Sequence, residues 1–283
     1  MKKRNRFGIF TLVLILSLCG CTQDKIPISS SSDVQKEQDT LPEAEITPEE
    51  EPFLYGYQNL NEEEKTRYRQ ILAGIENYED SVTVEVCSEE EINKVSNLVF
   101  VDHPEIFWLE QQNYSFNQKE NSDVDLLELN LVYNMGKDEI EDTKQQIEAK
   151  AEEWSQELSN CENEYDKIKY VYEFLGKNVL YDSESENNQN IQSVFLNQST
   201  VCMGFAKATQ YLLVRNGIFC TLVTGKVIPE NMEHAWNLVR IGENYYYVDT
   251  TWSSSGFVPE EDSIQDFSYT YLCCTAQTLE RSH

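Results

Sequence analysis

A cysteine stands at the start of a predicted helix in the second half of the chain. Ser199 or Thr200 is placed to cap a helix that contains Cys202 in its first turn and stops at Asn216-Gly217. The unpaired backbone N–H groups and the dipole of a first turn favour an anion and lower the pKa of a thiol there. The same N–H groups could stabilise a developing oxyanion. Cys202 is therefore a candidate nucleophile, although a cysteine at a helix start is more often structural.

A predicted hairpin further along carries a histidine and an aspartate on one face. Residues 233–240 and 244–249 are typical of two strands joined by a tight two-residue turn. That turn places His234 diagonal to Asp249, at about 7–8 Å between backbones. Asp249 could then orient His234, while His234 takes the proton of Cys202. The alternative is a structural histidine and a capping aspartate, and a one-residue change of the turn would separate the two side chains.

Four stretches of this region together resemble the signature of the transglutaminase-like superfamily. They are STVCMGFA at 199–206, GIFCTLVTG at 217–225, EHAWNLV at 233–239 and YVDTTW at 247–252. The nucleophilic cysteine, the histidine and the aspartate of that family match Cys202, His234 and Asp249 in the same chain order. The resemblance covers residues 161–283 strongly and residues 52–160 weakly.

The resemblance implies an α+β fold. Residues 161–283 are expected to form a papain-like, transglutaminase-like domain, in which the helix that bears the cysteine packs on an antiparallel sheet. Residues 52–160 are expected to form a smaller α+β domain before it. The family uses no metal and no organic cofactor. Gln192 is a candidate oxyanion side chain, and family-like sequence runs to His283, as it would in a C-terminally truncated form.

The first globular segment shows alternating helix and strand patterns but no chemistry. Apolar spacing, capping boxes and alternation predict its elements. They are a helix at 61–77, a strand at 81–86, a helix that begins with the capping box 88–91, a strand at 127–133 and an acidic helix at 138–158. The lone His103 precedes a proline, and we interpret it as a loop residue rather than a catalyst. A further amphipathic helix over 168–179 precedes the cysteine region.

The N-terminus is typical of an exported lipoprotein. Four basic residues precede a short apolar run that is unsuited to span a membrane, and the run ends in Cys19-Gly20-Cys21. This resembles a bacterial lipobox, so residues 1–20 are predicted to be a signal peptide and Cys21 a lipidated N-terminus. Residues 21–51 are polar and predicted to be a disordered tether. The protein is therefore expected outside the cytoplasm, anchored to the cell membrane by lipid alone.

Composition excludes several classes of function. With 22 basic and 50 acidic residues the net charge is −28, which excludes the basic footprint of a nucleic-acid-binding protein. The chain has three histidines, with no paired-ligand spacing among them, so no metal site is predicted. Six cysteines remain after Cys19 and Cys21, without a spacing that supports a disulfide framework.

The sequence leaves two main functions open, besides a structural surface protein whose first segment binds a partner. The first is a cysteine-nucleophile enzyme, either an amide hydrolase of the peptidase kind or an acyl transferase, with hydrolysis preferred. Its partner would be a peptide or protein substrate, such as one derived from the cell wall, by location only. The second is a non-catalytic transglutaminase-like binding module at the cell surface. A complete set of Cys202, His234 and Asp249 favours the enzyme, because a binding module can lose members of the triad.

Overall fold

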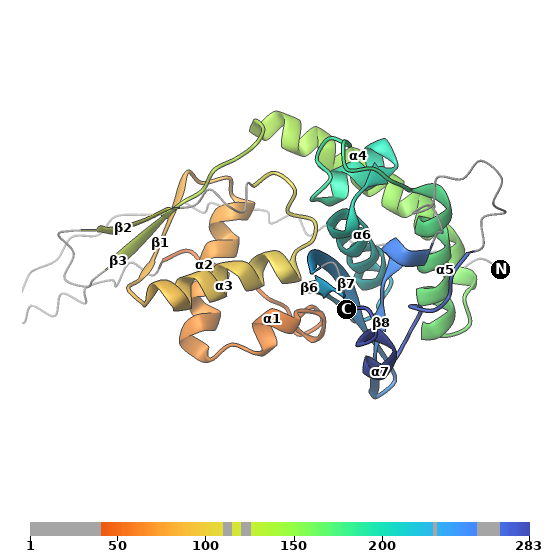
Figure 1. The fold of residues 1–283 in the computed structure, drawn as a ribbon. Helices are drawn as coiled ribbons and strands as arrows, with labels where there is room; N and C mark the ends of the chain where they lie inside the picture. Colours follow the sequence, from red (N-terminus) through yellow and green to blue (C-terminus); the bar gives the residue numbers. More distant parts are fainter. Residues whose placement is uncertain (1–40, 110–114, 120–125, 229–230, 254–266) are drawn as a thin grey trace, which may run out of the picture. The chain divides into compact units, whose positions relative to one another are not determined.

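The computed structural model describes residues 41–109, 115–119, 126–228, 231–253 and 267–283 (Figure 1). Residues 40–283 form one compact unit of helices and small sheets. In the described residues there are two three-stranded antiparallel sheets, β1-β3-β2 and β6-β7-β8, and a short parallel pair, β4-β5. The predicted α+β fold class is confirmed.

The first segment places two helices beside a small antiparallel sheet. The predicted capping box at Asn61 is present, since its side chain accepts from the N–H of Glu64 while the Glu64 carboxylate accepts from the N–H of Asn61. Ser88 caps the next helix by accepting from the N–H of Glu91, but the Glu91 carboxylate pairs with Arg67, so only half of the predicted capping box at 88–91 forms. The elements are η1 (Glu51–Phe53), α1 (Tyr55–Gln58), α2 (Glu62–Glu76), β1 (Ser81–Glu85), α3 (Glu89–Asp102), β2 (Ser115–Lys119) and β3 (Leu126–Asn130).

Residues near the C-terminal end of the predicted tether, residues 21–51, pack on the globular body. Ala44 is buried in the core, and its N–H donates to the carbonyl of Arg69 at 2.9 Å. Glu43 forms an ion pair with the Arg69 guanidinium at 2.7 Å. A short polar stretch orders here because a neighbouring helix supplies its partners, which composition alone does not reveal. The predicted signal peptide, Cys21 and residues 21–40 lie outside the described residues.

The acidic helix α4 (Lys137–Ser155) buries the narrow apolar stripe that its sequence predicts. Trp154, near its end, stacks on Phe195 with ring centroids 4.9 Å apart, and it also packs against Phe174. The 3-10 turn η2 (Gln156–Asn160) and the helix α5 (Glu164–Asn178) follow. A single hydrophobic core joins both predicted segments, so no break in packing marks the limit predicted at residue 160.

The second segment builds a helix over an antiparallel sheet (Figure 1). Helix α6 (Cys202–Arg215) packs against β6 and β7, and α5 packs beside α6. This is the papain-like arrangement that the resemblance implied. The elements are β4 (Leu180–Tyr181), η3 (Ser193–Asn197), β5 (Ser199–Thr200), α6, β6 (Cys220–Val227), β7 (Met232–Ile241), β8 (Asn244–Val248), η4 (Thr250–Ser253) and α7 (Ala276–Leu279).

The C-terminal end of α6 lies where the sequence predicts it, but the N-terminal cap differs from the prediction. Asn216 is the C-cap, and Gly217 follows with φ +76°, as the predicted stop requires. At the start, however, Val201 is the N-cap and no side chain caps the helix, so the cap predicted at Ser199 or Thr200 is wrong. The Thr200 hydroxyl is engaged elsewhere, because it donates to the carbonyl of Asn188 at 2.9 Å.

No helix in the described ranges combines the length and the apolar composition needed to cross a bilayer.

Candidate functional site

Cys202 is the first residue of α6, where the sequence placed it. The residue is half-buried, so its thiol is not sealed in an apolar interior. Because no side chain caps this helix, the N–H groups of its first turn are available to an anion at that point. The position therefore combines access with the positive end of a helix dipole, as a thiolate nucleophile requires.

The hairpin β7–β8 holds His234 and Asp249 together. Its register pairs Arg240 with Tyr245 and Asn237 with Val248, which is the register predicted from a two-residue turn. Gly242, in that turn, has φ +59° and so supplies the left-handed conformation that the tight connection needs. His234 Nε2 donates to Asp249 Oδ2 at 2.8 Å, and both side chains are buried. The predicted contact between the two residues is confirmed.

Charge on the histidine ring is stabilised by its neighbours. Burial alone lowers the pKa of His234, but hydrogen bonds to Asp249 and to the Cys202 thiol, with the attraction of both groups, raise that pKa to about 9. Burial raises the pKa of Asp249. Hydrogen bonds from His234 and His283 have the opposite and larger effect, so the pKa of Asp249 lies below its ordinary value. Since Nε2 of His234 is engaged by Asp249, Nδ1 is the ring nitrogen left for the thiol. The arrangement can hold an imidazolium beside a thiolate.

Residues 152–250 match the model of the transglutaminase-like superfamily. This stretch is a transglutaminase-like domain. The matched residues contain Cys202, His234 and Asp249, so the domain and the site coincide.

The individual proteins to which the chain is similar share less than a quarter of the aligned residues with it. Over 127 residues it is 24% identical to the kyphoscoliosis peptidase of Mus musculus, a match that covers 40% of this chain and 19% of the peptidase's length. The structure of a TGase aligns with a TM-score of 0.36 and 16% identity, over 67% of this chain and 54% of the other. A candidate cysteine protease from Cytophaga hutchinsonii aligns with a TM-score of 0.34 and 17% identity, over 50% and 62% of the two chains.

A second histidine contacts the aspartate of the transglutaminase-like domain, and sequence reasoning missed it. His283 Nε2 donates to Asp249 Oδ2 at 3.0 Å, beside the bond from His234. The His283 ring is buried against two tryptophans, with centroids 4.6 Å from Trp252 and 4.9 Å from Trp236. No spacing signals this contact, because His283 lies 34 residues from Asp249 and reaches it only through the tertiary fold.

The backbone around His283 is held at several points. The Ser282 carbonyl accepts from the N–H of Ile228 at 2.7 Å, and the Ser282 hydroxyl shares a hydrogen bond of 2.7 Å with that of Tyr271. Tyr271 in turn accepts from the N–H of Asp249 through its carbonyl at 3.0 Å. The second histidine is thus fixed to the same strand end that carries the aspartate.

His234, Asp249 and His283 could also ligate a metal ion. One ligand atom from each lies within 4.8 Å of the others. Two imidazoles and a carboxylate suit a divalent transition metal. An ion there would bind His234 through Nε2, so the ring proton would stay on Nδ1 and the ring could not accept the proton of the thiol. Such an ion would compete with nucleophilic catalysis rather than support it.

Gln192 stands just before η3, and its oxyanion role stays a prediction. Its N–H donates to the Asn190 side chain at 2.9 Å, while its side-chain carbonyl is buried without a partner. Among the described residues no hydrogen bond joins it to Cys202 or His234.

Two small features fix the cysteine helix to its surroundings. A side chain at Gly204 would overlap the Thr200 hydroxyl, so only glycine lets β5 approach the first turn of α6. On the sheet side, the buried Asn237 Nδ2 donates to the carbonyl of Ala206 at 3.0 Å. Asn237 lies on the strand that carries His234, and this bond therefore ties the histidine strand to the cysteine helix.

Proposed function

We propose that this protein is a cysteine-nucleophile enzyme that attacks amide carbonyls. One observation carries the proposal: a buried His234–Asp249 pair at 2.8 Å whose ring also interacts with a half-buried thiol at a helix start. A cysteine, a histidine and an aspartate with separate structural roles would not need an accessible thiol, a helix dipole and an oriented base at one place. Together they form the arrangement that nucleophilic acyl transfer uses.

The chemistry divides into two steps. The Cys202 thiol passes its proton to His234, and sulfur bonds to the carbonyl carbon while the N–H groups of the first turn of α6 stabilise the oxyanion. His234 then protonates the leaving amine as the C–N bond breaks, which leaves a thioester on Cys202. In the second step water loses a proton to His234 and attacks the thioester, so that the acid and the free thiol are released. Asp249 holds the ring throughout.

Hydrolysis is proposed over transfer to an amine, because water is abundant outside the cytoplasm. The substrate class proposed is a peptide or protein of the cell envelope, reached by an enzyme that Cys21 anchors to the membrane by lipid. The lipobox-like sequence at residues 18–21 and the basic, apolar segment before it support this location.

The test is product analysis on cell-envelope peptides with the purified protein. We expect new carboxyl and amino termini, and a loss of about 10⁴-fold or more in rate in Cys202→Ala and His234→Ala. Added primary amine should leave the products unchanged if water is the acceptor, while incorporation of the amine would indicate acyl transfer. Peptides that bind equally to the wild type and to Cys202→Ala but are never cleaved would identify a binding module instead.

A further inference from the structure

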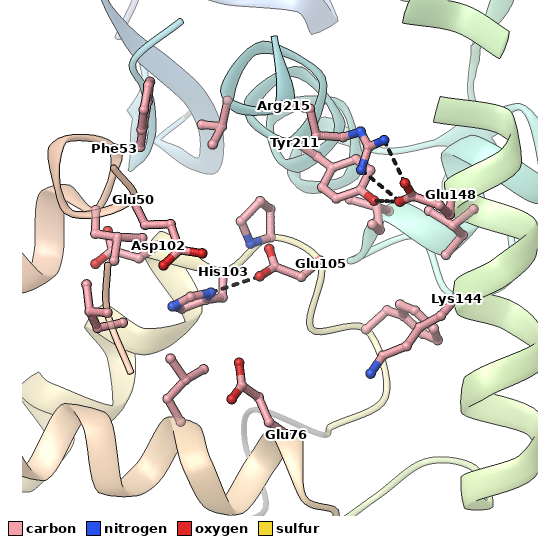
Figure 2. Close-up of a pocket in the computed structure, with 18 of the residues that line it drawn as sticks. Glu50, Phe53, Glu76, Asp102, His103, Glu105, Lys144, Glu148, Tyr211 and Arg215 are labelled. Atoms are coloured by element: carbon pink, nitrogen blue, oxygen red, sulfur yellow. Dashed lines mark hydrogen bonds and ion pairs between the residues drawn. The ribbon is translucent and has the colours of Figure 1, made fainter. Parts of the chain in front are cut away.

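A cavity of about 660 Å³ lies apart from the cysteine site (Figure 2). It is enclosed by α2, α4, α6, the segment of residues 45–54 and the loop that follows α3. Neither Cys202 nor His234 nor Asp249 lines it. Its volume falls within the roughly 300–1,000 Å³ of sites that take small molecules or side chains. The proposed enzymatic reaction does not use this cavity.

The walls combine an apolar surface with unpaired carboxylates. The apolar part comes from side chains of several elements, including Ile46, Phe53, Leu72, Phe107, Ile147 and Val214. Glu45, Glu49 and Glu76 also line the cavity, and none of their carboxylates has a hydrogen bond or an ion pair within the described residues. In Figure 2 the Glu76 carboxylate points from α2 toward the open centre.

The cations of the cavity are already engaged. The Arg215 guanidinium forms two bonds of 2.7 Å to the Glu148 carboxylate, which also accepts from Tyr211 (Figure 2). Lys144 pairs with Glu141 at 3.8 Å and lies over the Trp108 ring at 4.0 Å. These pairs leave the lining with an excess of negative charge, and so it favours a positively charged occupant.

Two buried nitrogen atoms lack a hydrogen-bond partner within the described residues. His103 Nδ1 donates to Glu105 at 2.8 Å, which leaves Nε2 of the neutral ring as an acceptor, and this nitrogen is buried with no partner. The indole N–H of Trp108, a residue only 3% exposed, is likewise buried without one. Both residues line the cavity. Buried polar groups nearly always have a partner, so the unpaired indole N–H beside the cavity indicates an occupant that brings an acceptor.

We propose that this cavity binds the basic side chain of a peptide. An ammonium or guanidinium group pairs with Glu76 and the neighbouring Glu45 and Glu49. The aliphatic stem packs on the apolar walls, and a peptide carbonyl accepts from the Trp108 indole. The site is separate from the chemistry at Cys202, so peptide binding there does not depend on the proposed enzymatic activity.

The experiment is calorimetric titration of the purified Cys202→Ala protein, which cannot turn the peptide over. The probe is acetyl-leucyl-lysine amide, and acetyl-leucyl-norleucine amide and acetyl-leucyl-glutamate amide are the matched peptides. We expect saturable binding of the lysine peptide alone. Glu76→Gln should weaken it by about tenfold, the effect of one lost charge-assisted hydrogen bond.

Two further variants separate the cavity from the general acidity of the surface. Glu90→Gln removes the same charge from an exposed position at the start of α3, and we expect it to leave binding unchanged. Ile46→Phe fills the cavity without altering charge and should weaken binding like Glu76→Gln. Thermal unfolding of each variant verifies folding. Equal binding of all three peptides, equal losses in Glu76→Gln and Glu90→Gln, or no saturable binding of the lysine peptide would overturn the proposal.

Discussion

His234 is the residue on which the site depends, because it contacts both the thiol and the carboxylate. Sequence alone predicted the contact of His234 with Asp249 and the place of Cys202 at a helix start, since the hairpin register follows from the length of one turn and the cysteine position from a helix stop and a motif. The roles of Cys202, His234 and Asp249 in catalysis stay predictions. The sequence could not reveal His283 as a partner of Asp249, because that contact depends on the path of the whole C-terminal stretch rather than on local spacing.

The raised pKa of His234 predicts a pH-dependent contribution to stability. The pKa is about 9 in the folded protein against 6.5 for an ordinary histidine, so protonation stabilises the fold. That contribution is fully present below pH 6.5 and is lost as the pH rises through 9, and its size is roughly 3 kcal/mol. Urea unfolding of the wild type and His234→Gln should show the larger difference at about pH 6 and a smaller one at about pH 10. A difference that does not change with pH would contradict the assignment.

The contact of His283 with Asp249 predicts that replacing His283 changes the pH at which Cys202 alkylation is lost on acidification. Hydrogen bonds from both histidines lower the pKa of Asp249 against the opposing effect of burial. His283→Leu removes one hydrogen-bond donor and lets the pKa of Asp249 rise. On acidification, the loss of Cys202 alkylation should therefore begin at a higher pH than in the wild type. His283→Gln retains an N–H donor and should restore part of the shift. The rate of alkylation across the acid range measures it, and an unchanged acid limb in both variants would show that His283 has only a packing role.

At the scale of elements, the site depends on how α6 is held between β5 and the sheet. The sequence predicted the helix, its stop and the hairpin, each of which follows from local periodicity and turn residues. It did not predict the start of α6, because the hydroxyl expected to cap it bonds to Asn188 and to Ser193 of another loop. Tertiary partners thus determined a position that local capping preference left open.

Gly204→Ala should disturb the cysteine helix at its first turn. The added methyl group overlaps the Thr200 hydroxyl, which its own bonds hold in place, so α6 must shift. We expect a loss of about 1–3 kcal/mol in the free energy of unfolding and slower alkylation of Cys202. Gly136→Ala is the matched control, because a methyl group there meets nothing within 4 Å. Equal effects of the two substitutions would rule out the close approach as the cause.

At the scale of the whole molecule, residues before the first helix belong to the globular body. Low hydrophobicity predicted disorder up to residue 51, but the Arg69 side chain and backbone supply partners to residues 43 and 44. The two segments also share one core, with Trp154 of α4 packed on Phe195. Sequence patterns report local structure, and they do not show which segments will pack together. The domain limits predicted at 52, 160 and 161 therefore stay predictions.

Lipid anchoring predicts where the protein is found in the cell. With Cys21 acylated, the protein should sediment with membranes and be released by detergent but not by salt, since the strongly negative net charge of the chain, −28 over the full sequence, disfavours binding to anionic lipid. Cys21→Ser removes the acceptor thiol and should move the protein out of the membrane fraction. Immunoblots of the two fractions measure this. Retention of Cys21→Ser in membranes would show that another part of the chain holds it there.

The pH dependence of Cys202 alkylation by iodoacetamide, followed by peptide mass spectrometry, tests the activated thiol most directly. A thiolate stabilised by an imidazolium should react rapidly at neutral pH, and His234→Ala should abolish that reactivity while the other cysteines are labelled as before. If Cys202 reacts at the same slow rate in both proteins, and its rate rises with pH as for an ordinary thiol of pKa about 8.5, then His234 does not activate it.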